Sequence, residues 1–210
     1  MSKILSSKWT KVVLFLLSLV PLGYLVGRAF QGKLTANPIE YITHFTGDWT
    51  IRFLLFTLAI TPLRGLFNRP QITRFRRMLG LFSYFYGSLH FLIWSVLDKQ
   101  LDPHIMWEDI LKRWYITVGM AALLGLTPLA ITSTAGWVRR LGYKRWQKLH
   151  RIVYGSAALG VIHYYLLVKS DIRLPVMYAA ILAVLLAYRM VAAGRKRFVP
   201  PKRAPAAAVR

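Results

Sequence analysis

Three histidines, His90, His150 and His163, are the residues of this sequence best suited to chemistry, because each lies in or beside a long apolar segment. Ionisable side chains inside a bilayer are costly and usually functional. Imidazole is also a common ligand of haem iron, and the helices of a bundle can hold a cofactor between facing side chains. The three residues therefore suggest a membrane haem protein.

The composition narrows the class of protein and of haem. The chain has 210 residues, of which 56% are hydrophobic, and a mean hydropathy of +0.42, which is too apolar for an ordinary soluble domain. Its net charge of +22 comes from cations that lie between apolar runs, so we interpret them as topology signals and expect no nucleic-acid binding. The absence of cysteine excludes thiolate-ligated haem, cysteine-ligated iron–sulfur clusters and covalent haem attachment. We expect any haem to be non-covalent and held by histidine.

Six apolar runs predict an all-α membrane protein, a bundle of six transmembrane helices over residues 11–192. We place the helices at residues 11–30, 49–63, 78–97, 114–131, 152–168 and 174–192. Most of these approach the roughly 20 residues that a helix needs to cross the hydrocarbon, although the second is short. Residues 1–10 are expected to form a cytoplasmic N-terminus, and residues 193–210 a basic, disordered tail attracted to anionic lipid.

The charges predict the orientation of this bundle. Most cations lie in four groups that the six spans place on one side, at residues 3–11, 64–77, 139–151 and 189–210. All seven acids lie on the other side: Glu40, Asp48, Asp98, Asp102, Glu108, Asp109 and Asp171. The positive-inside rule then puts both termini in the cytoplasm.

The predicted orientation allows the depth of each histidine in the membrane to be estimated. His90 lies 13 residues beyond Arg77, and His163 lies 12 residues beyond Arg151. At about 1.5 Å per residue, both imidazoles are expected roughly 18–20 Å from the inner edge, where they could bind one iron from opposite faces. The alternative for this pair is an interhelical hydrogen bond. His150 lies at the inner edge, roughly 20 Å below His163 and rotated by roughly 220° from it, and is either a second cofactor level or a solvated interfacial residue.

Arg52 is a further candidate, one helical turn beyond Asp48 near the outer end of the second span. A haem propionate there would neutralise the guanidinium, whereas the alternative is that Arg52 extends to the outer interface. A faint internal repeat accompanies these residues. It pairs Ile60-Thr61-Pro62-Leu63 with Leu126-Thr127-Pro128-Leu129, and Tyr86-Gly87-Ser88 with Tyr154-Gly155-Ser156.

The sequence contains no dinucleotide fingerprint and no catalytic triad, so we assign no catalytic residue. A haem bundle without a substrate domain is expected to pass electrons between partners, as the electron-transfer subunit of an oxidoreductase system. The alternatives are a stand-alone ferric or quinone reductase and a non-redox membrane scaffold or transporter.

Several segments resemble the MsrQ family of the ferric-reductase-like transmembrane group, over nearly the whole chain. They are HFTG at residues 44–47, LAITPL at 58–63, RRMLGL at 76–81 leading to Leu89-His90, the long segment TSTAGWVRRLGYKRWQKLH at 132–150, and Ile162-His163-Tyr164.

This resemblance implies an inner-membrane subunit that binds b-type haem and FMN. Such a subunit takes electrons from the respiratory quinone pool and passes them to a periplasmic molybdopterin reductase, MsrP, that repairs methionine sulfoxide. His90, His150 and His163 match the family's haem-associated histidines. Arg76 and Arg77 stand where related ferric reductases carry a further histidine, so a second bis-histidine haem lacks a ligand. His150 would then ligate a second haem on one side only, or help to hold FMN or quinone together with Arg76 and Arg77.

Overall fold

The computed structural model describes residues 7–198, which form helices and their connections without a strand in that range. The elements, in chain order, are α2 (Lys8–Phe30), α3 (Pro38–Leu66), η1 (Pro70–Phe75), α4 (Arg76–Leu92), η2 (Ile93–Asp98), α5 (Pro103–Lys112), α6 (Trp114–Ile131), α7 (Ala135–Leu141), α8 (Tyr143–Leu149), α9 (Ile152–Leu167) and α10 (Arg173–Phe198). The segment η1 is a 3₁₀-helix, and η2 is a π-helical turn that continues α4. The all-α prediction is confirmed for the described residues.

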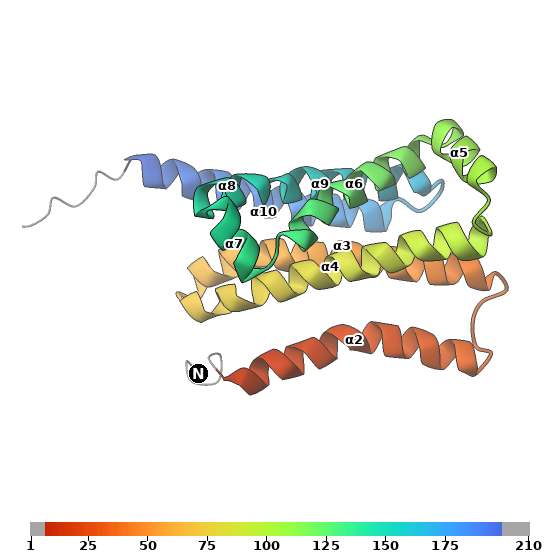
Figure 1. Ribbon diagram of the computed structural model, residues 1–210, viewed down its shortest axis with the longest axis horizontal. Coiled ribbons are helices and arrows are strands. Elements are labelled where there is room, and N and C mark those ends of the chain that lie inside the picture. Colours follow the sequence, from red (N-terminus) through yellow and green to blue (C-terminus); the bar gives the residue numbers. More distant parts are fainter. Residues whose placement is uncertain (1–6, 199–210) are drawn as a thin grey trace, which may run out of the picture.

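The long helices α2, α3, α4, α6, α9 and α10 run side by side along one axis (Figure 1). The start of α2, the α3–α4 connection, α7, α8 and the end of α10 lie at one end of this bundle. The α2–α3 connection, α5 and the α9–α10 connection lie at the other end. The cationic segments 64–77 and 139–151 and the acids of α5 therefore lie at opposite ends, as the charge pattern predicts.

Four helical segments among the described residues are long and apolar enough to cross a membrane, namely Lys8–Phe30, Pro70–Asp98, Trp114–Ile131 and Arg173–Gly194. They coincide with the predicted first, third, fourth and sixth spans. The predicted second and fifth spans fall in α3 and α9, which do not meet the same criterion. Helix α9 has only 16 residues, while α3 is long but carries charged side chains such as Asp48 and Arg52.

Helix α3 begins well before the predicted span 49–63. Its first turn is capped by Asn37, whose side chain accepts a hydrogen bond from the Glu40 N–H, and Pro38 occupies the first helical turn. Both residues favour a helix start at this point. Helix α10 likewise runs past the predicted end of its span to Phe198, into the predicted tail. The rest of that tail, and residues 1–6 of the predicted N-terminus, lie outside the described residues.

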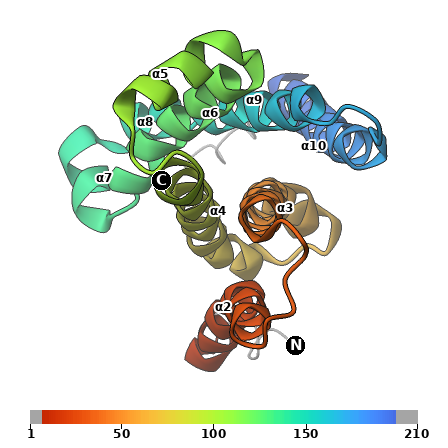
Figure 2. The same ribbon diagram turned by 90° about the vertical axis from the view of Figure 1, so that its right-hand side faces the viewer.

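The helices pack as two pairs, α3 with α4 and α6 with α9, and α2 lies on the far side of α3 and α4 from the rest (Figure 2). Small side chains make the contacts within the pairs. The Ser83 hydroxyl donates to the Thr50 carbonyl at 3.0 Å, and Gly125 faces Ser156. Small residues allow helix backbones to approach closely inside a membrane, where apolar burial provides no driving force between helices. The side chains that line the cavities described below come mainly from these two pairs.

Candidate functional site

His90 of α4 and His163 of α9 make the same hydrogen bond to the backbone of a neighbouring helix. Nδ1 of His90 lies 2.8 Å from the Thr43 carbonyl oxygen, and Nδ1 of His163 lies 2.6 Å from the Tyr115 carbonyl oxygen. A carbonyl only accepts hydrogen bonds, so each Nδ1 carries the proton and donates. Each Nε2 therefore keeps its lone pair, which is the arrangement found in metal-ligating histidines.

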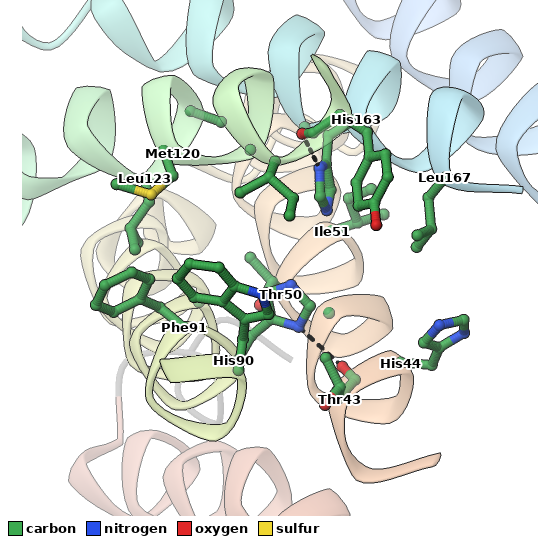
Figure 3. Close-up of a pocket in the computed structure, with 18 of the residues that line it drawn as sticks. Thr43, His44, Thr50, Ile51, His90, Phe91, Met120, Leu123, His163 and Leu167 are labelled. Carbon is green, nitrogen blue, oxygen red and sulfur yellow. Dashed lines mark hydrogen bonds between the residues drawn. The ribbon is translucent and has the colours of Figure 1, made fainter. Parts of the chain in front are cut away.

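The two imidazoles face each other across a gap that fits one metal atom. Their ring centroids lie 6.1 Å apart and their planes are inclined by 81°. Two metal–nitrogen bonds of about 2 Å each, together with the ring radii, give a centroid spacing of about 6 Å for two imidazoles on one metal. In Figure 3 each ring is hydrogen-bonded on the side that faces away from the other ring. The packing of α4 and α9 thus brings His90 and His163 together, while their ligation of a haem stays a prediction.

Both histidines line a cavity of about 480 Å³ between α3, α4, α6 and α9. The size is in the range of ordinary cofactor sites. Near the histidines the wall is largely apolar, with residues such as Ile51, Leu54 and Leu123, whereas polar and charged groups, including Glu40, Asp98 and Arg113, gather toward α5. An apolar wall with a charged mouth fits the chemistry of haem, which joins an apolar macrocycle to two carboxylates.

His44 also lines this cavity (Figure 3), which our sequence interpretation missed. The predicted spans 49–63, 78–97 and 114–131 leave His44 and His104 in loops outside the helices, and this is wrong, since the two residues lie in α3 and α5. The Asn37-Pro38 start signal could have revealed the first case. With the helix begun there, His44, Gly47 and Ile51 follow at helical spacing on one face.

A second cavity, of about 280 Å³, lies toward the opposite end of the bundle and brings His150 together with Arg76, Arg77 and Arg189. Its described lining residues include no Asp or Glu. Nδ1 of His150 donates to the Trp146 carbonyl at 3.1 Å, and the two rings lie 3.9 Å apart between centroids. Nε2 of His150 and Nε of Arg189 are buried without a hydrogen-bond partner among the described residues. A polar ligand in this cavity could pair with these atoms.

Arg52 does not line either of these cavities. Its guanidinium donates to the Tyr178 hydroxyl at 2.9 Å, forms a salt bridge with Asp48 at 3.3 Å, and lies 4.9 Å from the Trp49 ring centroid. The expectation of a propionate partner began from an unpaired guanidinium, and this guanidinium is paired. The propionate role of Arg52 stays a prediction without structural support.

A network of ion pairs joins α5 to the polar mouth of the larger cavity. Lys99 contacts Asp98 at 3.0 Å and Asp109 at 2.7 Å, and Arg113 contacts Asp109 at 3.2 Å. Burial lowers the pKa of Lys99, but its hydrogen bonds to Asp109 and Asp98 outweigh burial and hold that pKa above its ordinary value. The network fixes α5 beside the mouth.

Comparison with known proteins shows the family. A family model described as "Ferric reductase like transmembrane component" matches residues 46–161. The chain is 52% identical over 187 residues to a protein-methionine-sulfoxide reductase haem-binding subunit MsrQ of Rhodospirillum rubrum, which covers 89% of this chain and 90% of the relative. MsrQ of Herminiimonas arsenicoxydans is 50% identical over 89% of the chain and 87% of its own length, and MsrQ of Caulobacter vibrioides is 45% identical over 85% of each. The chain belongs to the MsrQ family.

The ferric-reductase match covers most of the site in this MsrQ family member. It includes Gly47, His90, Gly119 and His150 and ends two residues before His163. The matched segment thus forms most of both helix pairs and most of the walls of both cavities, while His44, His163 and Arg189 line the cavities from outside it.

Proposed function

We propose that this chain is the haem-binding membrane subunit of a methionine sulfoxide reductase system, in which His90 and His163 would hold the iron of one b-type haem. The observation that carries this proposal is the pair of imidazoles with unprotonated Nε2 atoms and ring centroids 6.1 Å apart. The relatives are named as haem-binding subunits of such a system, which supports the same conclusion.

Haem iron, when bound here, would accept and release one electron at a time. The residues of this chain would hold it and tune it. The carbonyls of Thr43 and Tyr115 keep each imidazole in the tautomer that ligates through Nε2. The apolar wall excludes water and favours the macrocycle, while Arg113 and His44, which line the polar part of the cavity, are suited to its carboxylates.

The smaller cavity is proposed as the inner cofactor site, with FMN as its occupant. The guanidiniums of Arg76, Arg77 and Arg189 surround a space without a described acid, which suits a phosphate group. Trp146, whose ring lies 3.9 Å from that of His150 between centroids, offers an aromatic surface to a planar ring system. A second haem with His150 as its only protein ligand is the competing occupant, and quinone is the proposed electron donor for this side.

We also propose the membrane orientation and the partner. Both termini are assigned to the cytoplasm of a six-span inner-membrane protein because the cationic segments 64–77 and 139–151 lie at the end where α2 starts. The opposite end, where α5 and the acids lie, is assigned to the periplasm and to docking of an MsrP-like molybdopterin reductase. Among the described residues, Glu40 and Asp102 of this end form no salt bridge, so their charges are available to a partner.

The decisive experiment is haem spectroscopy of the full chain in detergent. Expression with ample haem, followed by a pyridine haemochrome assay, should give one or more b haems per chain. His90→Ala and His163→Ala should each abolish the low-spin spectrum of the outer haem, while His104→Ala, at a side chain that is 81% exposed, should keep it. Retention of the full low-spin spectrum in both variants would exclude this ligand pair. Absence of any chromophore in the wild type would favour a non-redox scaffold.

A further inference from the structure

We propose that Gly47 and Gly119 are positioning residues for the axial imidazoles, each forming with a backbone carbonyl a cradle that holds one ring in its ligating orientation. This inference rests on the proposed ligation by His90 and His163. It assigns a role in tuning the haem to two residues that carry no functional group.

Each glycine leaves the space that an imidazole occupies. A Cβ atom on Gly47 would lie 3.1 Å from Cε1 and Nδ1 of His90. A Cβ atom on Gly119 would lie 2.6 Å from Nδ1 and 2.8 Å from Cε1 of His163. The first distance is tighter than nearly all Cβ contacts, and the second is closer than real Cβ atoms come. Any other residue at position 119 therefore has to displace the ring of His163.

The same helical turn supplies the acceptor for each ring. His90 donates to the carbonyl of Thr43, four residues before Gly47, and His163 donates to the carbonyl of Tyr115, four residues before Gly119. In an α-helix this is the carbonyl to which the N–H of the glycine itself is directed. An imidazole can reach it from the side only if the residue one turn later has no side chain. The glycine and the hydrogen bond are thus one device.

The device occurs once in each helix pair, at nearly the same spacing along the chain. Gly47 precedes His90 by 43 residues, and Gly119 precedes His163 by 44. A glycine also stands three residues before each histidine, at Gly87 and Gly160. This alignment differs from the predicted repeat, which paired Tyr86-Gly87-Ser88 with Tyr154-Gly155-Ser156 and places those motifs at unequal distances from the histidines.

The cradle has an electronic consequence. An Nδ1–H that donates a hydrogen bond makes its imidazole a more basic ligand, which favours the oxidised iron. A methyl group that pushes the ring away lengthens this bond and turns the ring. We expect a higher midpoint potential of the haem and changed low-spin EPR g-values. The shift should be larger for Gly119→Ala than for Gly47→Ala, because a Cβ atom at position 119 would overlap its imidazole more closely.

The test compares Gly47→Ala and Gly119→Ala in the haem-loaded full chain with Gly155→Ala, whose Cβ meets nothing within 4 Å. Size-exclusion chromatography identifies folded protein, and redox titration and EPR report the ligand field. The proposal expects Gly155→Ala to match the wild type, Gly47→Ala to shift both readouts, and Gly119→Ala to shift them further or lose haem. If Gly119→Ala does not fold, the milder Gly47→Ala variant decides.

Unchanged potentials and g-values in the folded glycine variants would overturn the inference. The histidine variants separate this outcome from failure of the proposed function. Loss of the low-spin spectrum in His90→Ala and His163→Ala, with glycine variants like the wild type, overturns only the cradle. Retention of that spectrum in both histidine variants overturns the ligation on which the cradle depends.

Discussion

The Tyr86 side chain of α4 reaches the backbone of α2, where its hydroxyl donates a hydrogen bond to the Ser18 carbonyl at 2.9 Å. It also accepts a hydrogen bond from the N–H of Leu22 at 3.2 Å. Ser18 and Leu22 are the acceptor and donor of one ordinary helical hydrogen bond, so the hydroxyl pairs with both ends of the same turn of α2. Pro21 lies within the same turn, where a proline disturbs the hydrogen bonds of the helix around it. Tyr86 is fully buried.

Tyr86→Phe should therefore loosen α2 from the bundle. The substitution leaves the Ser18 carbonyl and the Leu22 N–H without their bridging partner, and we expect a loss of about 1–3 kcal/mol in the free energy of unfolding. Denaturant unfolding in detergent measures it, with Tyr165→Phe, at a half-exposed ring of α9, as the control. Equal stability of the two variants would show that α2 closes its own hydrogen bond.

The smaller cavity, lined by Arg76, Arg77 and Arg189, predicts variants that lose flavin but keep haem. Replacing Arg76 and Arg77 together by Gln removes two guanidiniums from the proposed phosphate site, and each charge-assisted hydrogen bond lost should weaken FMN binding by roughly 10-fold or more. We expect flavin fluorescence of the purified protein to fall while the haem-to-protein ratio is unchanged. Arg139→Gln, a cation of the same end that does not line the cavity, should keep the flavin.

His150→Ala distinguishes the two proposed occupants of this cavity. If FMN is bound there, the variant should retain the haem content of the wild type, and its flavin should bind more weakly because the Trp146 ring loses the imidazole that packs against it. The haem-to-protein ratio by pyridine haemochrome is the measurement. A fall to half of the wild-type ratio would instead assign His150 as a ligand of a second haem.

The outer ion pairs predict a pH-dependent stability. Lys99→Met leaves the nearly buried Asp109 with Arg113 as its remaining partner, and should cost about 1–3 kcal/mol at neutral pH. The pKa of Lys99 is raised on folding, so its contribution is complete below the unfolded-state value. The difference between wild type and Lys99→Met should hold through neutral pH and decline only as the pH rises through the raised pKa. If wild type and Lys99→Met were equally stable at neutral pH, where Lys99 is charged, the result would contradict the pairing.

Electron transfer to the partner is tested directly. The haem of the purified chain is reduced with a quinol, and its reoxidation is followed after adding an MsrP-like reductase together with a methionine sulfoxide substrate. We expect reoxidation to be faster than with the reductase or the substrate alone. Equal rates in all three mixtures would remove the relay assignment, and turnover without any partner would favour a stand-alone reductase.

The sequence by itself determined the class of this protein and the elements that carry its chemistry. The apolar runs predict the helices because a bilayer requires long apolar segments. Most cations lie at one end and the acids at the other, because the positive-inside bias acts on the loops of a membrane protein. Counting residues along two helices placed His90 and His163 at one depth, since the rise per residue of an α-helix is constant.

Only the tertiary structure decided which side chains meet. Helix rotation and helix packing determine this, and neither follows from hydropathy. For this reason the sequence did not predict that Arg52 hydrogen-bonds to Tyr178 as well as pairing with Asp48. It also did not predict that His44 lines the larger cavity, or that Arg189 joins His150 in the smaller one. For the same reason Gly47 and Gly119 carry no signal in the sequence. Their role depends on imidazoles that belong to other helices, some 43 residues away along the chain, and that pack against them in the folded protein.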